Sequence, residues 1–457
     1  MKLKVLITGA LLVLSGIATV HAKVHEYTLD NGLKLLVKTD RRFPVVISQI
    51  WYKVGSSYEH NGITGISHML EHMMFKGTTD VPNGEFSRII ASLGGRENAF
   101  TSSDYTAYFQ RLEKSHLETS FKLEADRMRN ALFPEDEFIK ERSVVAEERR
   151  LRTEDNPQSK AYEQFRAAAF VSSPYHHSVI GWMSDIQNYD VADAREWYRK
   201  WYAPNNATLV VVGDVEPENV LALAKKYYGP LKPEQISSIK PRPEIPQQGE
   251  RRLTLKFPAT IDYVMMGYKV PSLNTVAKGD EWEVYALEVL AWILDGGDSS
   301  RLSRELLREQ QLVASTSISY DPYARLQTLL MMSAVPAKGK QIEDVEAALR
   351  AQITRLREAP VTAEELERVK TQVTAGRVFE RDSIFYQAMQ LGTLETVGIG
   401  WQADAVFEER IKAVTADQVQ AVAKKYLIDD RLTVAILEPQ ALETASNVKS
   451  NVKSDAH

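Results

Sequence analysis

The sequence predicts an α+β fold made of two homologous domains, each a β-sheet backed by helices. The prediction rests on one order of elements that occurs twice. Residues 191–201 have helical periodicity, 202–206 form a polar turn, and 207–214 are a strand-like run rich in β-branched residues. The same order of helix, turn and apolar strand returns over residues 414–437. Such a recurrence indicates a duplicated unit in which helices cover a sheet.

A proline-rich segment separates the two copies. Residues 229–249 contain Pro230, Pro233, Pro241, Pro243 and Pro246. Proline cannot continue a helix or a central strand, so this segment is predicted to be the linker. The N-terminal domain is then expected at 23–228 and the C-terminal domain at 250–440. The polar, non-periodic end of the chain, 441–457, is predicted to be disordered.

The first 22 residues have the features of a signal peptide. Lys2 and Lys4 precede a mostly apolar run over 5–20, and Val20-His21-Ala22 is a small-x-small cleavage site. An uncleaved anchor is the alternative, but the run is shorter than the about 20 residues that a spanning helix needs. We therefore expect a secreted, periplasmic protein with no membrane attachment after signal cleavage.

Composition excludes several classes of function. The chain has 0 cysteines, so it has no disulfide and no thiolate metal ligand. Its net charge is -5, and removal of two lysines with the signal (54 bases against 61 acids) makes it -7. A mildly acidic chain without a basic stripe gives no reason to expect a nucleic acid or an anionic membrane as partner.

The motif His68-x-x-Glu71-His72 carries the most chemical information in the chain. On a helix, residues four apart share one face, so both imidazoles could bind one metal ion with Glu71 beside them. This is the inverted order of the zincin motif. The alternative is an amphipathic helix that carries two histidines by chance, but burying three titratable groups without a metal would be costly.

A catalytic zinc usually takes three protein ligands and leaves one position open, so a third ligand is needed. The charged stretch 141–150 is predicted to be helical. There Glu141 and Glu148 lie two turns apart on one face, whereas Glu147 points about 100° away. Spacing alone favours Glu148 as the ligand and Glu141 as a hydrogen-bond partner of an imidazole, but leaves open that both are solvated surface charges.

Longer stretches surround these residues and carry a family resemblance. They are 29–33, 51–56, 62–78, 94–101 and 211–214. With them the chain resembles the pitrilysin-type inverzincin zinc metallopeptidases, which include insulysin and the mitochondrial processing peptidase. The resemblance implies half of a clamshell whose two domains each have a mainly antiparallel sheet. It also implies one Zn²⁺ per chain, held by His68, His72 and Glu148, with Glu141 hydrogen-bonded to a ligating imidazole.

These roles predict a zinc-dependent endopeptidase acting on peptides or unfolded segments. Glu71 would take a proton from the attacking water and deliver it to the leaving amine. The resemblance further implies that Asn98, Ala99 and Phe100 form an edge strand that pairs with the substrate. It makes Phe75 a wall of a substrate pocket, with plain core packing as the alternative.

The resemblance also predicts how the second half and a partner contribute. Arg308 occupies the position of a substrate-binding arginine, but Ser315 stands where the family has a tyrosine. Tyr320 would face the opposite side of a strand from Ser315. The chain is therefore expected to pair with a homologous subunit that lacks the zinc motif, with a homodimer as the alternative.

Two further expectations concern function. A non-catalytic or weakly catalytic peptide-binding subunit of a heterodimeric complex is the alternative to an active peptidase, and Ser315 is the residue that makes it credible. His176 and His177 follow a turn at Pro174 and could be mistaken for ligands, but we expect them to have packing or surface roles.

Overall fold

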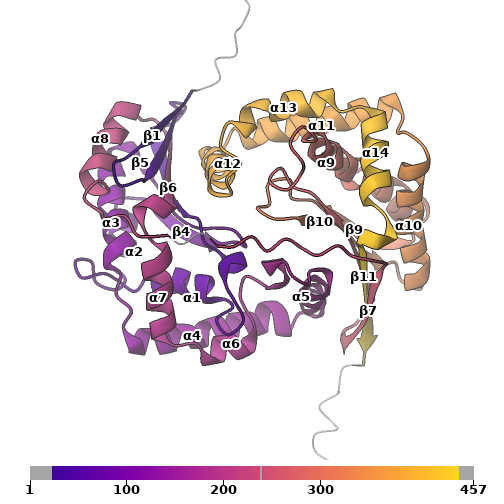
Figure 1. Cartoon of the computed structure of the whole chain (residues 1–457), viewed down its shortest axis with the longest axis horizontal. Helices are drawn as coiled ribbons and strands as arrows, with labels where there is room; N and C mark the ends of the chain where they lie inside the picture. Colours follow the sequence, from indigo (N-terminus) through magenta and orange to yellow (C-terminus); the bar gives the residue numbers. More distant parts are fainter. Residues whose placement is uncertain (1–22, 237–238, 442–457) are drawn as a thin grey trace, which may run out of the picture.

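The computed structural model describes residues 23–236 and 239–441, and its fold has two sheets covered by helices (Figure 1). The predicted signal peptide and all but the first residue of the predicted tail lie outside the described residues. The first sheet has six strands in the order β1 (Val24–Thr28), β2 (Lys34–Thr39), β6 (Ala207–Gly213), β3 (Val45–Tyr52), β5 (Thr106–Glu113) and β4 (Arg96–Thr101). The second sheet has five, in the order β7 (Arg251–Pro258), β11 (Leu432–Gln440), β8 (Tyr263–Val270), β10 (Thr328–Pro336) and β9 (Val313–Ser319).

Apart from the additional strand β1, which pairs with β2, the two sheets share one topology. In each, one parallel pair, β2 with β6 and β7 with β11, is followed by antiparallel pairs out to an edge strand, β4 or β9. This correspondence confirms the predicted fold class of two homologous, mainly antiparallel units. The chain boundaries predicted for the domains and the linker stay predictions.

Each half has its own set of helices. Those of the first half are α1 (Ile66–Met73), α2 (Glu85–Ser92), α3 (Leu117–Asn130), α4 (Glu135–Arg149), α5 (Pro157–Ala169), α6 (Met183–Asn188), α7 (Val191–Trp201) and α8 (Pro217–Tyr227). Those of the second half are α9 (Trp282–Asp295), α10 (Ile342–Glu358), α11 (Ala363–Glu380), α12 (Ile384–Thr396), α13 (Ala403–Ala413) and α14 (Ala416–Tyr426). Among the described residues, no helix is both long enough and apolar enough to cross a bilayer.

Both faces of each sheet are buried, and each half supplies a helix to the other. On β6, Leu209 and Val211 face the core of the first half, whereas Val210 and Val212 pack with Leu391 of α12 from the second half. In return, α5 of the first half packs against β7 and β11 of the second sheet through side chains such as Phe165. Alternating residues of a strand point to opposite faces, so strands covered on both sides are apolar throughout.

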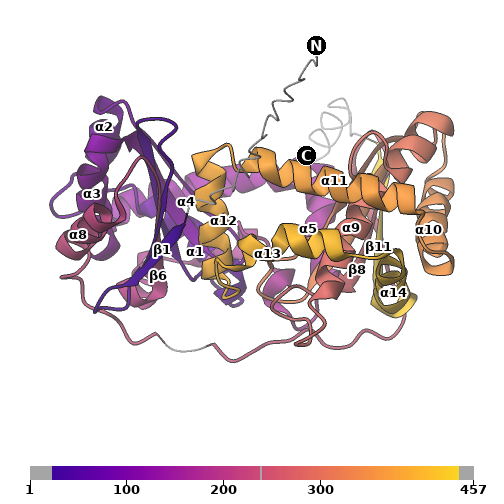
Figure 2. The same cartoon turned by 90° about the horizontal axis from the view of Figure 1, so that it is seen from above.

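An extended segment joins the halves. Between α8 and β7, the described residues form no helix or strand, and Figure 2 shows this segment running along one side of the molecule from α8 to the second half. The halves are held together by α5, which packs on the second sheet, by α12, which packs on the first sheet, and by this segment. These contacts stabilise the first sheet, which supports α1.

Candidate metal centre

Helix α1 presents its polar residues on a single face because its apolar residues enter the core. The buried apolar side chains are those of Ile66, Met69, Leu70 and Met73. Gly65 is the N-cap residue before the helix, and its φ of 86° suits glycine. The Glu59 carboxylate accepts hydrogen bonds from the backbone N–H groups of Gly65 (2.7 Å) and Ser67 (2.8 Å). These bonds satisfy N–H groups at the helix start that have no partner within the helix.

Three predicted ligands converge between α1 and α4. The Nε2 atom of His68 lies 3.8 Å from one Glu148 oxygen, and Nε2 of His72 lies 3.6 Å from the other. One ligand atom from each residue lies within 4.8 Å of the other two. Two imidazoles and a carboxylate are the donor set of a catalytic zinc site with one open position. The chemistry and spacing of these residues therefore fit a zinc ion.

The orientation of His72 is fixed by α4. Its Nδ1 lies 3.0 Å from Glu141, which also pairs with Lys76 at 2.5 Å. Burial alone would raise the pKa of Glu141, but Lys76 and His72 offset this effect and lower it. Because Glu141 is then ionised, Nδ1 of His72 donates the hydrogen bond, and Nε2 remains free as a metal ligand.

Burial also shifts the pKa values of His68 and Glu71, the other two polar residues of the motif. It lowers the pKa of His68 to about 3, with His72 and Arg152 adding to the effect, so the imidazole is neutral at physiological pH. Burial raises the pKa of Glu71, while a 2.5 Å hydrogen bond from Thr101 Oγ1 opposes the shift. A carboxylate with a raised pKa is a better proton acceptor.

A cleft of about 640 Å³ opens over these residues. Its lining includes Asn98, Ala99 and Phe100 of the edge strand β4, and on the other side Ser178, Val179 and Ile180. Strand β4 pairs only with β5 within the sheet, so one of its edges has no partner strand. An edge strand beside a candidate metal site is suited to pairing with an extended peptide.

Other predicted residues lie away from this cleft. All described residues that line it fall between His68 and Ile180, so none comes from the second half. Phe75 packs against Tyr108, with ring centroids 6.2 Å apart, and lies under Arg127, whose guanidinium carbon is 5.1 Å from the Phe75 ring centroid. This arrangement favours the core-packing alternative for Phe75.

Arg308 and Ser315 of the second half occupy exposed positions. Arg308 is at the end of the π-helical segment η6 (Leu302–Glu309) and donates to the carbonyl of Asp298. Ser315 is exposed on the edge strand β9. Tyr320 donates a 2.7 Å hydrogen bond to the carbonyl of Pro271. The chain does not bring Arg308 or Ser315 to the cleft over the candidate metal site.

His176 and His177, which lie outside the motif, have packing contacts. His177 is buried, and its ring centroid lies 3.8 Å from that of His176, which contacts the carbonyl of Ser173 at 2.7 Å. Neither belongs to the candidate metal group found among the described residues.

Three contacts were not predicted from the sequence. Arg152 pairs with Glu148 at 2.6 Å, Thr101 donates to Glu71, and Lys76 pairs with Glu141. Arg152 follows Glu148 by four residues, so helical spacing could have suggested this pair. Lys76 lies beyond the end of α1 and contacts Glu141 of another helix, so it has no such signal. The Thr101 contact joins a helix to a strand across the cleft and has no such local signal.

Comparison with known proteins identifies the family. Residues 35–181, which include all the candidate ligands and Glu71, match the model described as insulinase (peptidase family M16). Residues 188–373 match the model described as the peptidase M16 inactive domain. The zinc protease PqqE of Helicobacter pylori is 33% identical over 95% of this chain and 98% of its own length. The chain belongs to peptidase family M16.

Further proteins are similar in sequence or fold. An uncharacterized zinc protease of Bacillus subtilis, YmxG, is 24% identical, covering 91% of this chain and 98% of its own. The crystal structure of a protease from Helicobacter pylori superposes with a TM-score of 0.86 at 31% identity, covering 92% of this chain and 100% of that one. The first half of the periplasmic protease PqqL from Escherichia coli shares the fold, with a TM-score of 0.75 at 21% identity and coverage of 93% and 95%.

Proposed function

We propose that this M16 chain is a zinc-dependent endopeptidase that hydrolyses peptides or unfolded segments in the periplasm. One zinc ion per chain would be held by His68, His72 and Glu148, with Glu71 as the general base. The observation that carries the proposal is the convergence of these three ligands beside Glu71, in a cleft bordered by the unpaired edge of β4.

In the proposed hydrolysis, different residues of the chain bind the metal, hold the substrate and transfer the proton. A zinc ion held there supplies Lewis-acid chemistry toward water and a peptide carbonyl. The backbone of β4 holds the substrate as an added strand, which aligns the scissile bond along the cleft. Glu71 accepts a proton as water adds to the carbonyl carbon and returns it to the departing nitrogen as the C–N bond breaks. Thr101 orients the Glu71 carboxylate for both transfers.

A second candidate function is a peptide-binding subunit with little activity of its own. It is favoured by the exposed positions of Arg308 and Ser315, away from a cleft whose described lining is entirely from the first half. In this proposal a homologous subunit without the zinc motif would supply the groups that complete the site. A homodimer is the alternative partnership.

The test is hydrolysis of a quenched, unstructured peptide by the purified chain. We expect activity that a chelator removes and that Glu71→Gln abolishes while zinc content stays at one per chain. Glu147→Gln is a matched control because Glu147 is an exposed residue of the same helix as Glu148. A chain that cleaves no peptide alone but becomes active with a homologous subunit would support the second candidate function. No hydrolysis with or without that subunit would contradict peptidase function.

The proposed location has a separate test. PqqL of Escherichia coli, which shares this fold, is a periplasmic protease, and the signal-like residues 1–22 support export of this chain as well. N-terminal sequencing of the protein from a periplasmic extract should begin at Lys23. A full-length chain in the cytosolic fraction would contradict export.

A further inference from the structure

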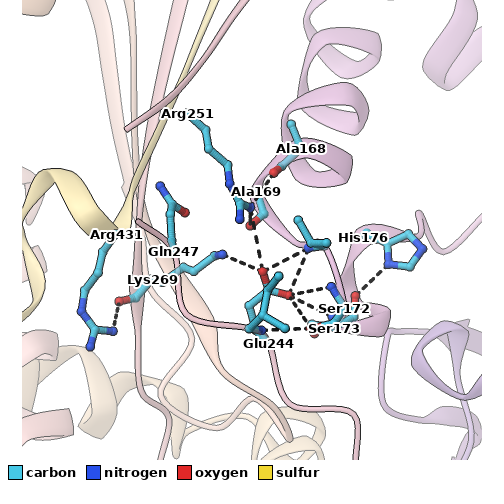
Figure 3. Close-up of polar contacts among 12 residues, drawn as sticks. Ala168, Ala169, Ser172, Ser173, His176, Glu244, Gln247, Arg251, Lys269 and Arg431 are labelled. Atoms are coloured by element: carbon cyan, nitrogen blue, oxygen red, sulfur yellow. Dashed lines mark hydrogen bonds and ion pairs between the residues drawn. The ribbon is translucent and has the colours of Figure 1, made fainter. Parts of the chain in front are cut away.

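The segment between the halves carries a buried carboxylate with an unusual set of partners. The side chain of Glu244 is 0% exposed. Its oxygens accept hydrogen bonds from the backbone N–H groups of Val171 (3.0 Å), Ser172 (3.0 Å) and Ser173 (2.9 Å), three consecutive residues after α5. The ammonium of Lys269 on β8 donates to the same carboxylate at 2.7 Å. Figure 3 shows these contacts converging on Glu244.

Residues 171–173 and the segment around Glu244 each donate hydrogen bonds to the other, and Lys269 balances the charge of Glu244. The hydroxyl of Ser172 donates to the carbonyl of Pro243 (2.8 Å) and accepts from the N–H of Ile245 (2.9 Å), so it binds the backbone on both sides of Glu244. Burial alone would raise the pKa of Glu244, but Lys269 and the backbone N–H groups offset it and lower the pKa. The carboxylate is therefore ionised and fully compensated within the protein.

The end of α5 is held at the same place. Arg251, the first residue of β7, donates to the carbonyls of Ala168 (2.9 Å) and Ala169 (3.0 Å), and it lies 3.9 Å from Glu244. The last carbonyls of a helix have no partner within the helix, and here the second half satisfies them. Three parts of the chain meet at Glu244: the end of α5, the linking segment and the second sheet.

The loop that Glu244 binds leads directly into the zinc cleft. Ser173 begins the short helix η4 (Pro174–His176), and its carbonyl contacts His176. The chain then forms the cleft wall at residues 178–180. This wall packs closely against the start of α1. A Cβ added at Gly65 would lie 2.3 Å from the carbonyl oxygen of Ile180.

We propose that Glu244 is a positioning residue for the zinc cleft. By binding three backbone N–H groups and Lys269 together, it fixes residues 171–180 and makes the shape of the cleft wall depend on docking of the second half. Residues 178–180 line the same cleft as β4, so their position sets how closely a peptide added to β4 is enclosed. The link to catalysis rests on the proposed peptidase function, whereas the effect on residues 171–180 does not.

The first test is Glu244→Gln, measured by amide hydrogen exchange and by peptide hydrolysis. A Gln side chain directs an NH₂ group at N–H donors and leaves Lys269 without its carboxylate. We expect exchange over residues 171–180 to be about tenfold faster or more. For the same reason KM should rise by about tenfold with kcat nearly unchanged, because the ligands and Glu71 are untouched. Zinc content should stay at its wild-type value.

Two further variants separate positioning from loss of stability. The double variant Glu244→Gln/Lys269→Met removes the unpaired buried ammonium, so its melting temperature should recover relative to Glu244→Gln while its KM stays raised. Glu234→Gln is the matched control, because Glu234 is another glutamate of the linking segment but pairs with Arg129 near the surface. It should leave exchange over residues 171–180 and KM unchanged.

Failure of the proposed peptidase function and failure of the proposed role of Glu244 can be told apart. If the wild-type chain cleaves no peptide, the proposed function fails, but the exchange measurement still decides the role of Glu244. Unchanged exchange over 171–180 in the folded Glu244 variants would overturn the inference, as would a lower kcat with unchanged KM, which is the signature of a smaller folded fraction.

Discussion

Glu141 contacts Nδ1 of His72 at 3.0 Å, while Glu148 faces Nε2 of the same imidazole at 3.6 Å. One helix, α4, thus supplies both a candidate ligand and the residue that orients another ligand. The two glutamates are two turns apart on one face. The metal site is therefore as rigid as the packing of α1 against α4.

We predict that Glu141→Gln weakens zinc binding by about 10- to 100-fold, the usual effect of losing a carboxylate behind a ligating histidine. The neutral Gln side chain accepts a weaker hydrogen bond from Nδ1–H of His72 than the carboxylate does. It also leaves Lys76 without its ion-pair partner. Competition with a chromogenic chelator measures the affinity. Glu147→Gln, on the exposed side of the same helix, should bind zinc as tightly as the wild type, and equal affinities for all three proteins would contradict the prediction.

Much of this site could be predicted because its signals are local. His68, Glu71 and His72 lie within one helix, and Glu141 and Glu148 within another, so helical spacing places them on shared faces. The edge position of Asn98 followed from a resemblance over a longer stretch. The duplicated order of elements likewise predicted the two sheets before any contact was known.

The remaining features depend on contacts between distant parts of the chain. Nothing near Leu391 indicates that α12 covers the sheet of the other half, because a buried helix has the same apolar pattern whichever sheet it meets. The segment around Glu244 looked like a plain linker, since prolines mark irregular backbone but do not reveal a buried carboxylate. Phe75 followed the motif in sequence, yet its packing on Tyr108 is decided by tertiary structure.

One buried and one half-buried carboxyl group, those of Glu59 and Glu288, predict how stability changes with pH. Burial raises the pKa of both Glu59 and Glu288 from 4.5 to about 7. Between these values the folded protein holds protons that the unfolded chain has released. The free energy of unfolding that each group contributes is therefore fully present below pH 4.5 and is lost as pH rises through 7, by on the order of 3 kcal/mol.

The variant Glu288→Gln tests this prediction at one of the two groups. Glu288 accepts a 3.2 Å hydrogen bond from Nε1 of Trp292, which a Gln oxygen can also accept. Urea unfolding at pH 5 and pH 8 should show a smaller loss of stability for the variant than for the wild type, with the variant more stable at pH 8. The same loss in both proteins would show that Glu288 titrates normally.

The contact between Gly392 and Trp51 predicts a site where added volume is not tolerated. Gly392 lies in α12, and a Cβ there would come within 2.1 Å of the Trp51 ring. Trp51 is fully buried, and its Nε1 donates to Gln49 at 3.0 Å. It also packs edge-on against Phe100 of β4, with ring centroids 5.3 Å apart. The ring cannot move without disturbing the strand that borders the zinc cleft.

We therefore expect Gly392→Ala to destabilise the protein by about 1–3 kcal/mol through overpacking, even though alanine favours a helix. Gly376→Ala is the matched control, because Gly376 is in α11 and its nearest neighbour to a new Cβ is 3.8 Å away. There the same substitution should stabilise the protein by up to about 1 kcal/mol. Chemical denaturation measures both changes. If the two variants were stabilised alike, α12 would not be tightly docked on the first sheet, and the halves would be joined less firmly than the packing of Trp51 indicates.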